Sequence, residues 1–129
     1  MSTKNSTQPN KRETGTRYEE QAAAYLRSLG YRILTHSFRC RLGEIDLVAE
    51  DHATLVFVEV KYRKDASSGH ALEAVDLHKQ QRICRVADYY RVRYRVPEDK
   101  NCRFDVVGVM GGQYTLIKNA FPYQTQNNW

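Results

Sequence analysis

An acidic and a basic residue lie two positions apart in the otherwise apolar stretch VFVEVKYRK, residues 56–64. Side chains two positions apart on a β-strand point to the same face, so Glu59 and Lys61 would share one face while the valines of the stretch occupy the other. Taken alone, such a pair is most simply a solvated ion pair. It becomes a candidate for metal-assisted hydrolysis only if other acidic residues are brought beside it.

The preceding apolar stretch, GEIDLVAE at residues 43–50, also carries acidic residues at alternate positions. Strand periodicity predicts that Glu44 and Asp46 share one face of the strand, while Ile45 and Leu47 share the other. Glu44 can be interpreted as a further metal-binding acid or as an exposed strand residue, and the second interpretation is favoured.

A hairpin would bring the two stretches together. If residues 50–55 form its turn, Asp46 falls directly opposite Glu59, with β-carbons about 4.5–5.5 Å apart. Two carboxylates this close repel each other unless a cation lies between them or one takes up a proton. The inference depends on the register, because a slip of one residue would send the two side chains to opposite faces.

In that register the hairpin supplies the parts of a phosphodiester-cleaving site. The carboxylates of Asp46 and Glu59 and the carbonyl oxygen of Val60 are hard oxygen ligands of the kind that Mg²⁺ or Mn²⁺ prefers. Lys61 would lie beside the waters that such an ion keeps. Its ammonium group can help to orient or deprotonate a water and can offset charge on a phosphate in the transition state.

The elements that must position this hairpin alternate in one short domain. A first helix is predicted from Thr16, which forms a capping box with Glu19, to a stop at Gly30. The other predicted elements are strands at residues 31–39, 43–50, 54–63, 103–110 and 113–118 and a second helix at residues 70–91. This order predicts a single α/β domain at residues 14–121, between a disordered N-terminal tail at residues 1–13 and a C-terminal tail at residues 122–129.

The chain of 129 residues is basic, with a formal net charge of +5. A basic balance favours polyanions such as nucleic acid, and the interleaved arginines and tyrosines at residues 84–95 suit either phosphate contact with base stacking or an ordinary amphipathic helix. Cys40, Cys84 and Cys102 have no metal-site spacing and are expected to be buried and reduced. With no apolar run of signal-peptide or membrane-spanning type, the sequence predicts a cytoplasmic protein.

Several pieces of the sequence together resemble one known family. D-x(n)-E-x-K on a hairpin resembles the signature of the restriction-endonuclease-like, or PD-(D/E)XK, nuclease fold, although Ile45 stands where that signature has proline. More specifically, the chain resembles the YraN-like family (UPF0102) of small bacterial proteins, itself similar to archaeal Holliday junction resolvases. The matching pieces are YEEQAAAYLRSLGYRIL, GEIDLVA, VFVEVKYR, AVDLHKQQRI and CRFDVVGV.

The resemblance implies a restriction-endonuclease-like single domain, with an α-β-β-β-α-β core, a mixed central sheet and a metal site at one sheet edge. It implies that Asp46, Glu59 and Lys61 are catalytic, with metal bound by Asp46, Glu59 and the Val60 carbonyl. In resolvase-like relatives a glutamate of the first helix adds to the metal site, and Glu19 matches it. For Glu19 this role and the capping box remain alternatives.

Four residues are expected to contact nucleic acid, namely Lys79, Gln80, Arg63 and Arg82. Lys79 interrupts the apolar stripe of the second helix, which a lysine extending its stem along the surface to solvent would explain equally well. Asp105 is predicted to be structural, with Arg103 as a candidate partner.

The predicted function is a Mg²⁺- or Mn²⁺-dependent endonuclease that acts on branched or single-stranded DNA, in the manner of a Holliday junction resolvase. The pattern does not discriminate between DNA and RNA. The alternative is a nucleic-acid-binding module on the same fold that has no catalytic activity. Symmetric cleavage of a four-way junction needs two active sites, so a homodimer is expected for that substrate.

Overall fold

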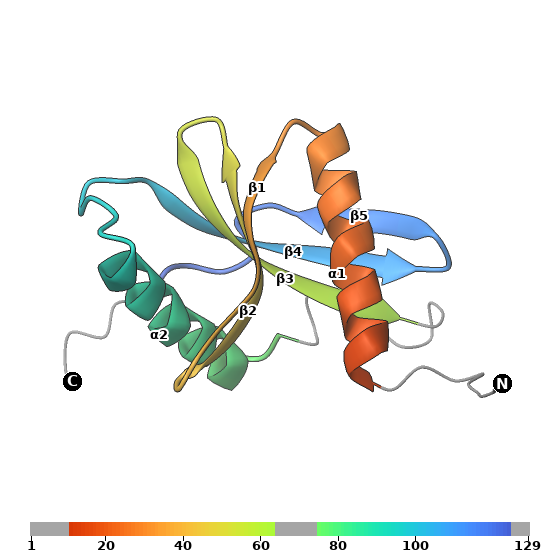
Figure 1. Ribbon diagram of the computed structural model, residues 1–129, viewed down its shortest axis with the longest axis horizontal. Helices are drawn as coiled ribbons and strands as arrows, with labels where there is room; N and C mark the ends of the chain where they lie inside the picture. The colour runs from red at the N-terminus through yellow and green to blue at the C-terminus, as the bar shows by residue number, and fades with distance from the viewer. Residues whose placement is uncertain (1–10, 64–74, 125–129) are drawn as a thin grey trace, which may run out of the picture.

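A five-stranded sheet in the order β1-β2-β3-β4-β5 forms the middle layer of the domain (Figure 1). The computed structural model describes residues 11–63 and 75–124. Over these residues the elements are α1 (Lys11–Ser28), β1 (Arg32–Cys40), β2 (Gly43–Asp51), β3 (Thr54–Arg63), α2 (Leu77–Arg93), β4 (Cys102–Met110) and β5 (Gln113–Ile117). The prediction of one α/β domain with this element order is confirmed.

The sheet is mixed because one of its strand pairs is parallel. β3 and β4 run parallel, whereas the other three neighbouring pairs are antiparallel. Parallel neighbours need a crossover connection, and α2 lies in the segment that joins them. The predicted mixed central sheet is therefore present.

The two helices pack on opposite faces of the sheet. Along β3, Phe57 belongs to the hydrophobic core beneath α2, and its neighbour Val58 belongs to the core beneath α1. A strand buried on both faces reads as a continuous apolar run, which explains the VFV of this stretch. Val56 and Val60 pack on the α1 side with Val58, as the alternation predicts.

Helix α1 begins earlier than the sequence pattern indicates. It starts at Lys11, so Thr16 lies inside the helix and the capping-box interpretation is wrong. Residues 11–13, which the pattern assigns to the N-terminal tail, are helical. The C-terminal end is as expected, since Gly30 has a φ of 97° and the Tyr31 amide donates to the Leu26 carbonyl at 3.0 Å. Residues 1–10 lie outside the described part of the chain.

Helix α2 begins after Asp76, whose side chain accepts a hydrogen bond from the Lys79 amide at 2.9 Å. The helix predicted from residue 70 therefore begins too early, since residues 75 and 76 are not helical, and residues 70–74 lie outside the described residues. The arginine–tyrosine stretch serves packing in part, because Tyr90 is buried and the Arg91 guanidinium lies 5.5 Å from the centre of the Tyr123 ring.

Residues just beyond the predicted domain end also pack. Tyr123 lies in the predicted tail at residues 122–129, yet its hydroxyl donates to Asp88 at 2.5 Å and its ring packs on the α2 core. The domain therefore extends at least to Gln124, whose amide donates to the Cys84 sulfur at 3.4 Å. Cys84 is buried, whereas Cys40 and Cys102 are half-buried, and all three thiols are free.

A buried polar network closes the end of the sheet near the β2–β3 turn. The fully buried Asp105 accepts from Arg103 Nε at 2.9 Å and from the Tyr31 hydroxyl at 2.7 Å. It also accepts from the Asn119 amide at 2.9 Å. Arg103 donates in addition to Asp51 at 2.8 Å. Asp105 is structural, as predicted, because its charge is fully matched within the fold.

Candidate active site

The candidate site lies where β2 and β3 separate, an opening that we call the fork. The two strands pair from Asp51↔Thr54 to Leu47↔Val58. Past that last pair β2 remains bonded to β1, and β3 remains bonded to β4. In the continued register Asp46 and Glu59 are the first residues beyond the pairing, which confirms the predicted register.

Asp46 occupies the centre of the fork. Its Oδ2 accepts a hydrogen bond from the Val60 amide at 2.8 Å. Beyond the last β2–β3 pair, the Asp46 side chain thus takes the place of a β2 backbone carbonyl as the partner of this amide. Because the N–H and C=O of a strand residue point to the same side, the Val60 carbonyl also faces the fork. An oxygen of Glu19 lies within 4.8 Å of the Asp46 carboxyl, and the negative charge of Glu59 on β3 also acts on it.

Glu19 reaches the fork from α1 and is held there by β1. It is a buried acid, 9% exposed, and it accepts a hydrogen bond from the Ser37 hydroxyl. Ser37 has a φ of 50°, which is uncommon for a residue with a side chain, and it faces Asp46 across the β1–β2 register. The contact gives Glu19 a place in the site, consistent with the metal-site alternative rather than the cap.

Ile45 and Leu47 lie on opposite faces of the sheet, contrary to the prediction from the strand pattern. Ile45 packs with Phe38 in the α2 core, whereas Leu47 belongs to the α1 core. Strand periodicity predicts that the two share a face. Strict alternation does not hold across this point, where Ser37 on the paired strand departs from extended geometry with its positive φ.

Three carboxylates converge in this region. Oxygens of Glu19, Glu44 and Asp46 all lie within 4.8 Å of one another. Glu44 Oε1 is 3.3 Å from Arg39 Nε. Glu44 is exposed on β2, as the sequence pattern favours, and its carboxylate nevertheless lies close to those of Glu19 and Asp46.

The cluster is short of positive charge. Burial raises the pKa of Asp46 far above its usual range, and the negative charge of Glu59 raises it further. Burial also raises the pKa of Glu19, although hydrogen bonds from Ser37 and Asp46 oppose this effect. Carboxyl groups in this condition must hold a proton or a cation between them.

Lys61 supplies one positive charge at the edge of the fork. Its Nζ lies 3.2 Å from Glu59 Oε2, and the two side chains are 20% and 15% exposed. This places the acid and the base on the same face of β3, as the spacing predicts. The Lys61 ammonium group is thus held beside the Glu59 carboxylate and remains partly exposed to solvent.

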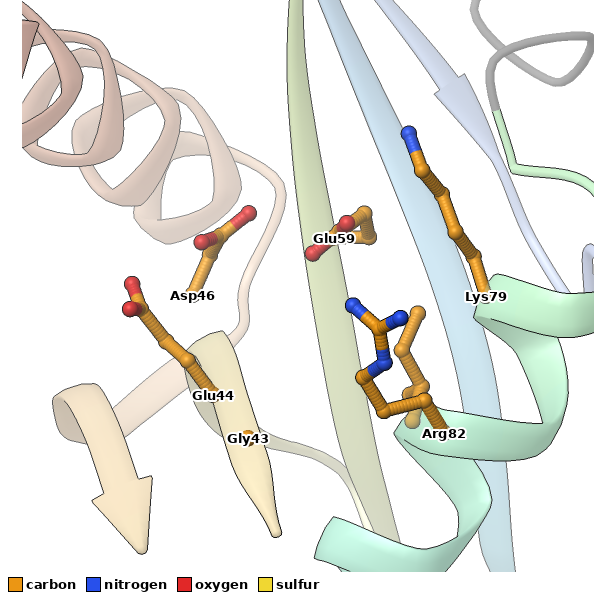
Figure 2. A pocket seen from close by; sticks show the side chains of 7 residues that line it. Gly43, Glu44, Asp46, Glu59, Lys79 and Arg82 are labelled. Carbon is orange, nitrogen blue, oxygen red and sulfur yellow. The ribbon is translucent and has the colours of Figure 1, made fainter. Parts of the chain in front are cut away.

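A pocket of about 320 Å³ opens from the fork toward α2. Its lining residues are Gly43, Glu44, Asp46, Glu59, Lys79, Arg82 and Ile83. Figure 2 shows the carboxylates of Glu44, Asp46 and Glu59 on the strands, with Lys79 and Arg82 extending from α2 on the other side. The pocket thus has an acidic wall and a basic wall.

Two of the four residues expected to contact nucleic acid lie away from this pocket's lining. Gln80 donates to the Val75 carbonyl at 2.9 Å and accepts from Gln124 at 3.4 Å, so it ties α2 to the segments on either side. Arg63 is the last residue of β3, and its Nε is buried without a hydrogen-bond partner among the described residues. Contacts of Gln80 and Arg63 with nucleic acid stay predictions.

The fold and the fork together define a mixed α/β domain with a carboxylate-rich pocket at a split in its sheet. Within the described residues, neither helix is both long and apolar enough to cross a membrane. The chain belongs to the uncharacterised protein family UPF0102, which it matches over residues 18–109. Glu19, Asp46, Glu59 and Lys61 all lie in the matched region.

Three of the similar proteins match the chain over most of its length. A UPF0102 protein of Lachnoclostridium phytofermentans is 50% identical over 112 residues, covering 87% of this chain and 95% of the relative. One from Caldicellulosiruptor saccharolyticus is 45% identical over 120 residues, covering 87% of this chain and 99% of the relative. One from Alcanivorax borkumensis is 42% identical over 116 residues, covering 86% of this chain and 93% of the relative. The chain therefore spans nearly the full length of these relatives.

Proposed function

We propose that the protein is a divalent-metal-dependent endonuclease that cleaves branched or single-stranded DNA, similar in chemistry to a Holliday junction resolvase. The observation that carries the proposal is the fork itself. It places the Asp46 carboxylate on the Val60 amide, with oxygens of Glu19 and Glu44 within 4.8 Å, and it holds the Glu59–Lys61 ion pair on the neighbouring strand. A purely structural role would leave this concentration of carboxylates unexplained, since like charges held together cost stability.

The residues present suit Mg²⁺ or Mn²⁺. All donors are hard oxygens, the kind that these ions select over nitrogen or sulfur. Asp46, Glu59 and the Val60 carbonyl would hold the ion, with Glu19 as a further ligand. When bound, the ion would supply Lewis-acid polarisation of the scissile phosphate and would lower the pKa of a water molecule.

The side chains around the ion have separable tasks. Lys61 would orient the attacking water and offset the charge that grows on the phosphate, because its Nζ lies at the rim of the carboxylate cluster. Lys79 and Arg82 line the opposite wall, where they would bind phosphate oxygens and hold the backbone in position. The Ser37 hydroxyl keeps Glu19 aimed at Asp46.

The test is incubation of the protein with labelled single-stranded, duplex, flap and four-way-junction DNA in Mg²⁺ or Mn²⁺. Cleavage of at least one branched or single-stranded DNA is expected, together with a reduction of roughly 10²–10³-fold in rate for Lys61→Met. Lys118→Met is the matched control, because Lys118 lies at the other end of the sheet and pairs with Asp51 at 3.3 Å.

Binding without cleavage, at high protein concentration with both ions, would contradict the enzyme and support the non-catalytic binding module. Equal cleavage by the wild-type protein and Lys61→Met would show that the fork is not where the reaction occurs.

A further inference from the structure

The surface beside the fork continues as a groove between the β1–β2 turn and α2. A second pocket is lined by residues 39–44 and Arg82, and a third by Leu42, His78, Gln81, Arg82 and Arg85. Both share Arg82 with the pocket at the fork, so the three hollows adjoin one another. We call the two outer hollows together the α2 groove.

The turn and α2 are in direct contact, which fixes the position of Arg82. Gly43 has a φ of 143°, and a β-carbon at this position would lie 3.2 Å from Val86 Cγ2 and 3.3 Å from Arg82 Cδ. The backbone of the turn therefore packs on the stem of Arg82 and on Val86. The Arg82 guanidinium is left at the junction of the fork and the groove (Figure 2).

The α2 groove and the fork carry opposite charge. Of the described residues, four arginines line the groove, namely Arg39, Arg41, Arg82 and Arg85, together with one carboxylate, that of Glu44. Glu44 in turn is 3.3 Å from Arg39, at the boundary with the fork. A ligand with repeated negative charges would be attracted along the groove and would meet the carboxylates of the fork at its inner end.

From this arrangement we propose that the α2 groove binds the sugar–phosphate backbone of one DNA strand, on one side of the phosphate that occupies the fork. The proposal rests on the proposed function for the identity of the inner phosphate. Arg82 and Arg85 are neighbours on one helix face, with β-carbons about 5–6 Å apart, so they can reach successive phosphates of an extended strand. One guanidinium group can donate two parallel hydrogen bonds to two oxygens of the same phosphate, which a lysine ammonium cannot do in this geometry.

The groove would read backbone and not sequence. Its lining offers charge from the arginines and few groups at fixed positions for base edges, so its contribution is expected to be the same for any sequence. Binding of one DNA strand across both places would explain why the carboxylate cluster of the fork adjoins the arginines of the α2 groove. The same strand would be held through a cation at the fork and directly by guanidinium groups along α2.

The test measures binding without cleavage, using fluorescence anisotropy of a labelled single-stranded 20-mer in EDTA over a series of NaCl concentrations. The double variant Arg82→Gln/Arg85→Gln is expected to reduce the slope of log Kd against log salt by roughly 1.4, since each phosphate of a single strand that an arginine neutralises adds about 0.7 to that slope. At 100 mM NaCl its affinity should fall by roughly tenfold or more.

The matched control is Arg93→Gln/Arg95→Gln, which makes the same charge change at the exposed C-terminal end of α2. An equal reduction in both double variants would overturn the proposal, because general charge and not the groove would then govern binding. Thermal melting of both variants checks that the fold is retained. Polyglutamate binding as tight as DNA binding would assign the groove to an acidic peptide and also overturn the proposal.

Failure here and failure of the proposed function give different results. If the wild-type protein cleaves DNA but the Arg82→Gln/Arg85→Gln slope is unchanged, the α2 groove proposal is wrong and the endonuclease stands. If the slope falls as expected but no DNA is cleaved, the groove stands and catalysis at the fork does not.

Discussion

Replacement of Asp46 with asparagine should stabilise the metal-free protein. The Asp46 carboxylate lies within 4.8 Å of oxygens on Glu19 and Glu44. One ionised pair at that separation costs about 3 kcal/mol at an effective dielectric constant of 20. Proton uptake relieves part of this repulsion, so a net gain of roughly 1–3 kcal/mol is expected for the variant near pH 8. The amide oxygen of asparagine can still accept the Val60 hydrogen bond.

The gain should depend on pH in a defined direction. The pKa of Asp46 is raised in the folded protein, so the folded state retains a proton that the unfolded chain loses above about pH 4. Wild-type stability therefore falls as pH rises above that value, whereas asparagine does not titrate. The difference between the two proteins should be small near pH 4.5 and largest at pH 8–9.

The assay is thermal unfolding in EDTA, with roughly 4–12 °C expected between the two proteins at pH 8. Asp99→Asn is the control, because it removes one negative charge at an exposed loop position remote from the fork. Saturating Mn²⁺ should stabilise the wild-type protein by about 2.7 kcal/mol at a hundredfold excess over Kd and should leave Asp46→Asn nearly unchanged. A drop of several degrees for Asp46→Asn in EDTA would show that Asp46 is a buried structural charge with a needed partner, and would refute the reasoning.

Two further predictions concern the supports of the fork and the far end of the sheet. Ser37→Ala removes a hydroxyl whose hydrogen bond holds Glu19 in place and lowers the pKa of that carboxyl. Mn²⁺ affinity measured by calorimetry should therefore fall by roughly 10-fold or more. Ser28→Ala is the control and should have no effect, because it removes a similar hydrogen bond at an exposed serine. Hydrogen bonds from Arg103 above all lower the pKa of Asp51 to about 2, so this carboxylate stabilises the fold above about pH 4 and the contribution disappears as pH falls toward 2. Asp51→Asn should therefore be less stable than the wild-type protein at pH 7, by about 2 kcal/mol at most. Its stability should also decrease less on acidification. An acid unfolding curve identical to that of the wild-type protein would contradict this prediction.

The register of the hairpin could be predicted because two independent signals agree. Charged residues stand two positions apart on both strands, and the polar stretch between them predicts a hairpin centred at the right point. The turn itself is tighter than the predicted residues 50–55, because the strands stay paired as far as Asp51↔Thr54. Placing Asp46 opposite Glu59 required nothing beyond that pairing. The alternation does not hold one residue away, at Ile45. The positive φ of Ser37 on the paired strand could not be predicted, because no glycine marks that position in the sequence.

The remaining carboxylates depend on tertiary contacts. Glu19 enters the site only because α1 crosses the β1–β2 ribbon at Ser37, and the local pattern around it fits a helix cap equally well. The cap interpretation is wrong because α1 extends to Lys11, through residues with no strong helix-start signal of their own. For Glu44, the strand pattern predicts an exposed position on β2 but not its approach to Glu19, which depends on how α1 packs on the sheet.

Single-turnover cleavage of a labelled DNA that the wild-type protein cuts, measured over a range of Mn²⁺ concentrations, tests the central claim most directly. The wild-type rate should rise with Mn²⁺ and saturate, and Asp46→Asn should cleave at a rate lower by several orders of magnitude while binding the same DNA at least as tightly in EDTA. Cleavage by Asp46→Asn at the wild-type rate and with the same Mn²⁺ dependence would contradict a metal-dependent nuclease centred on the fork.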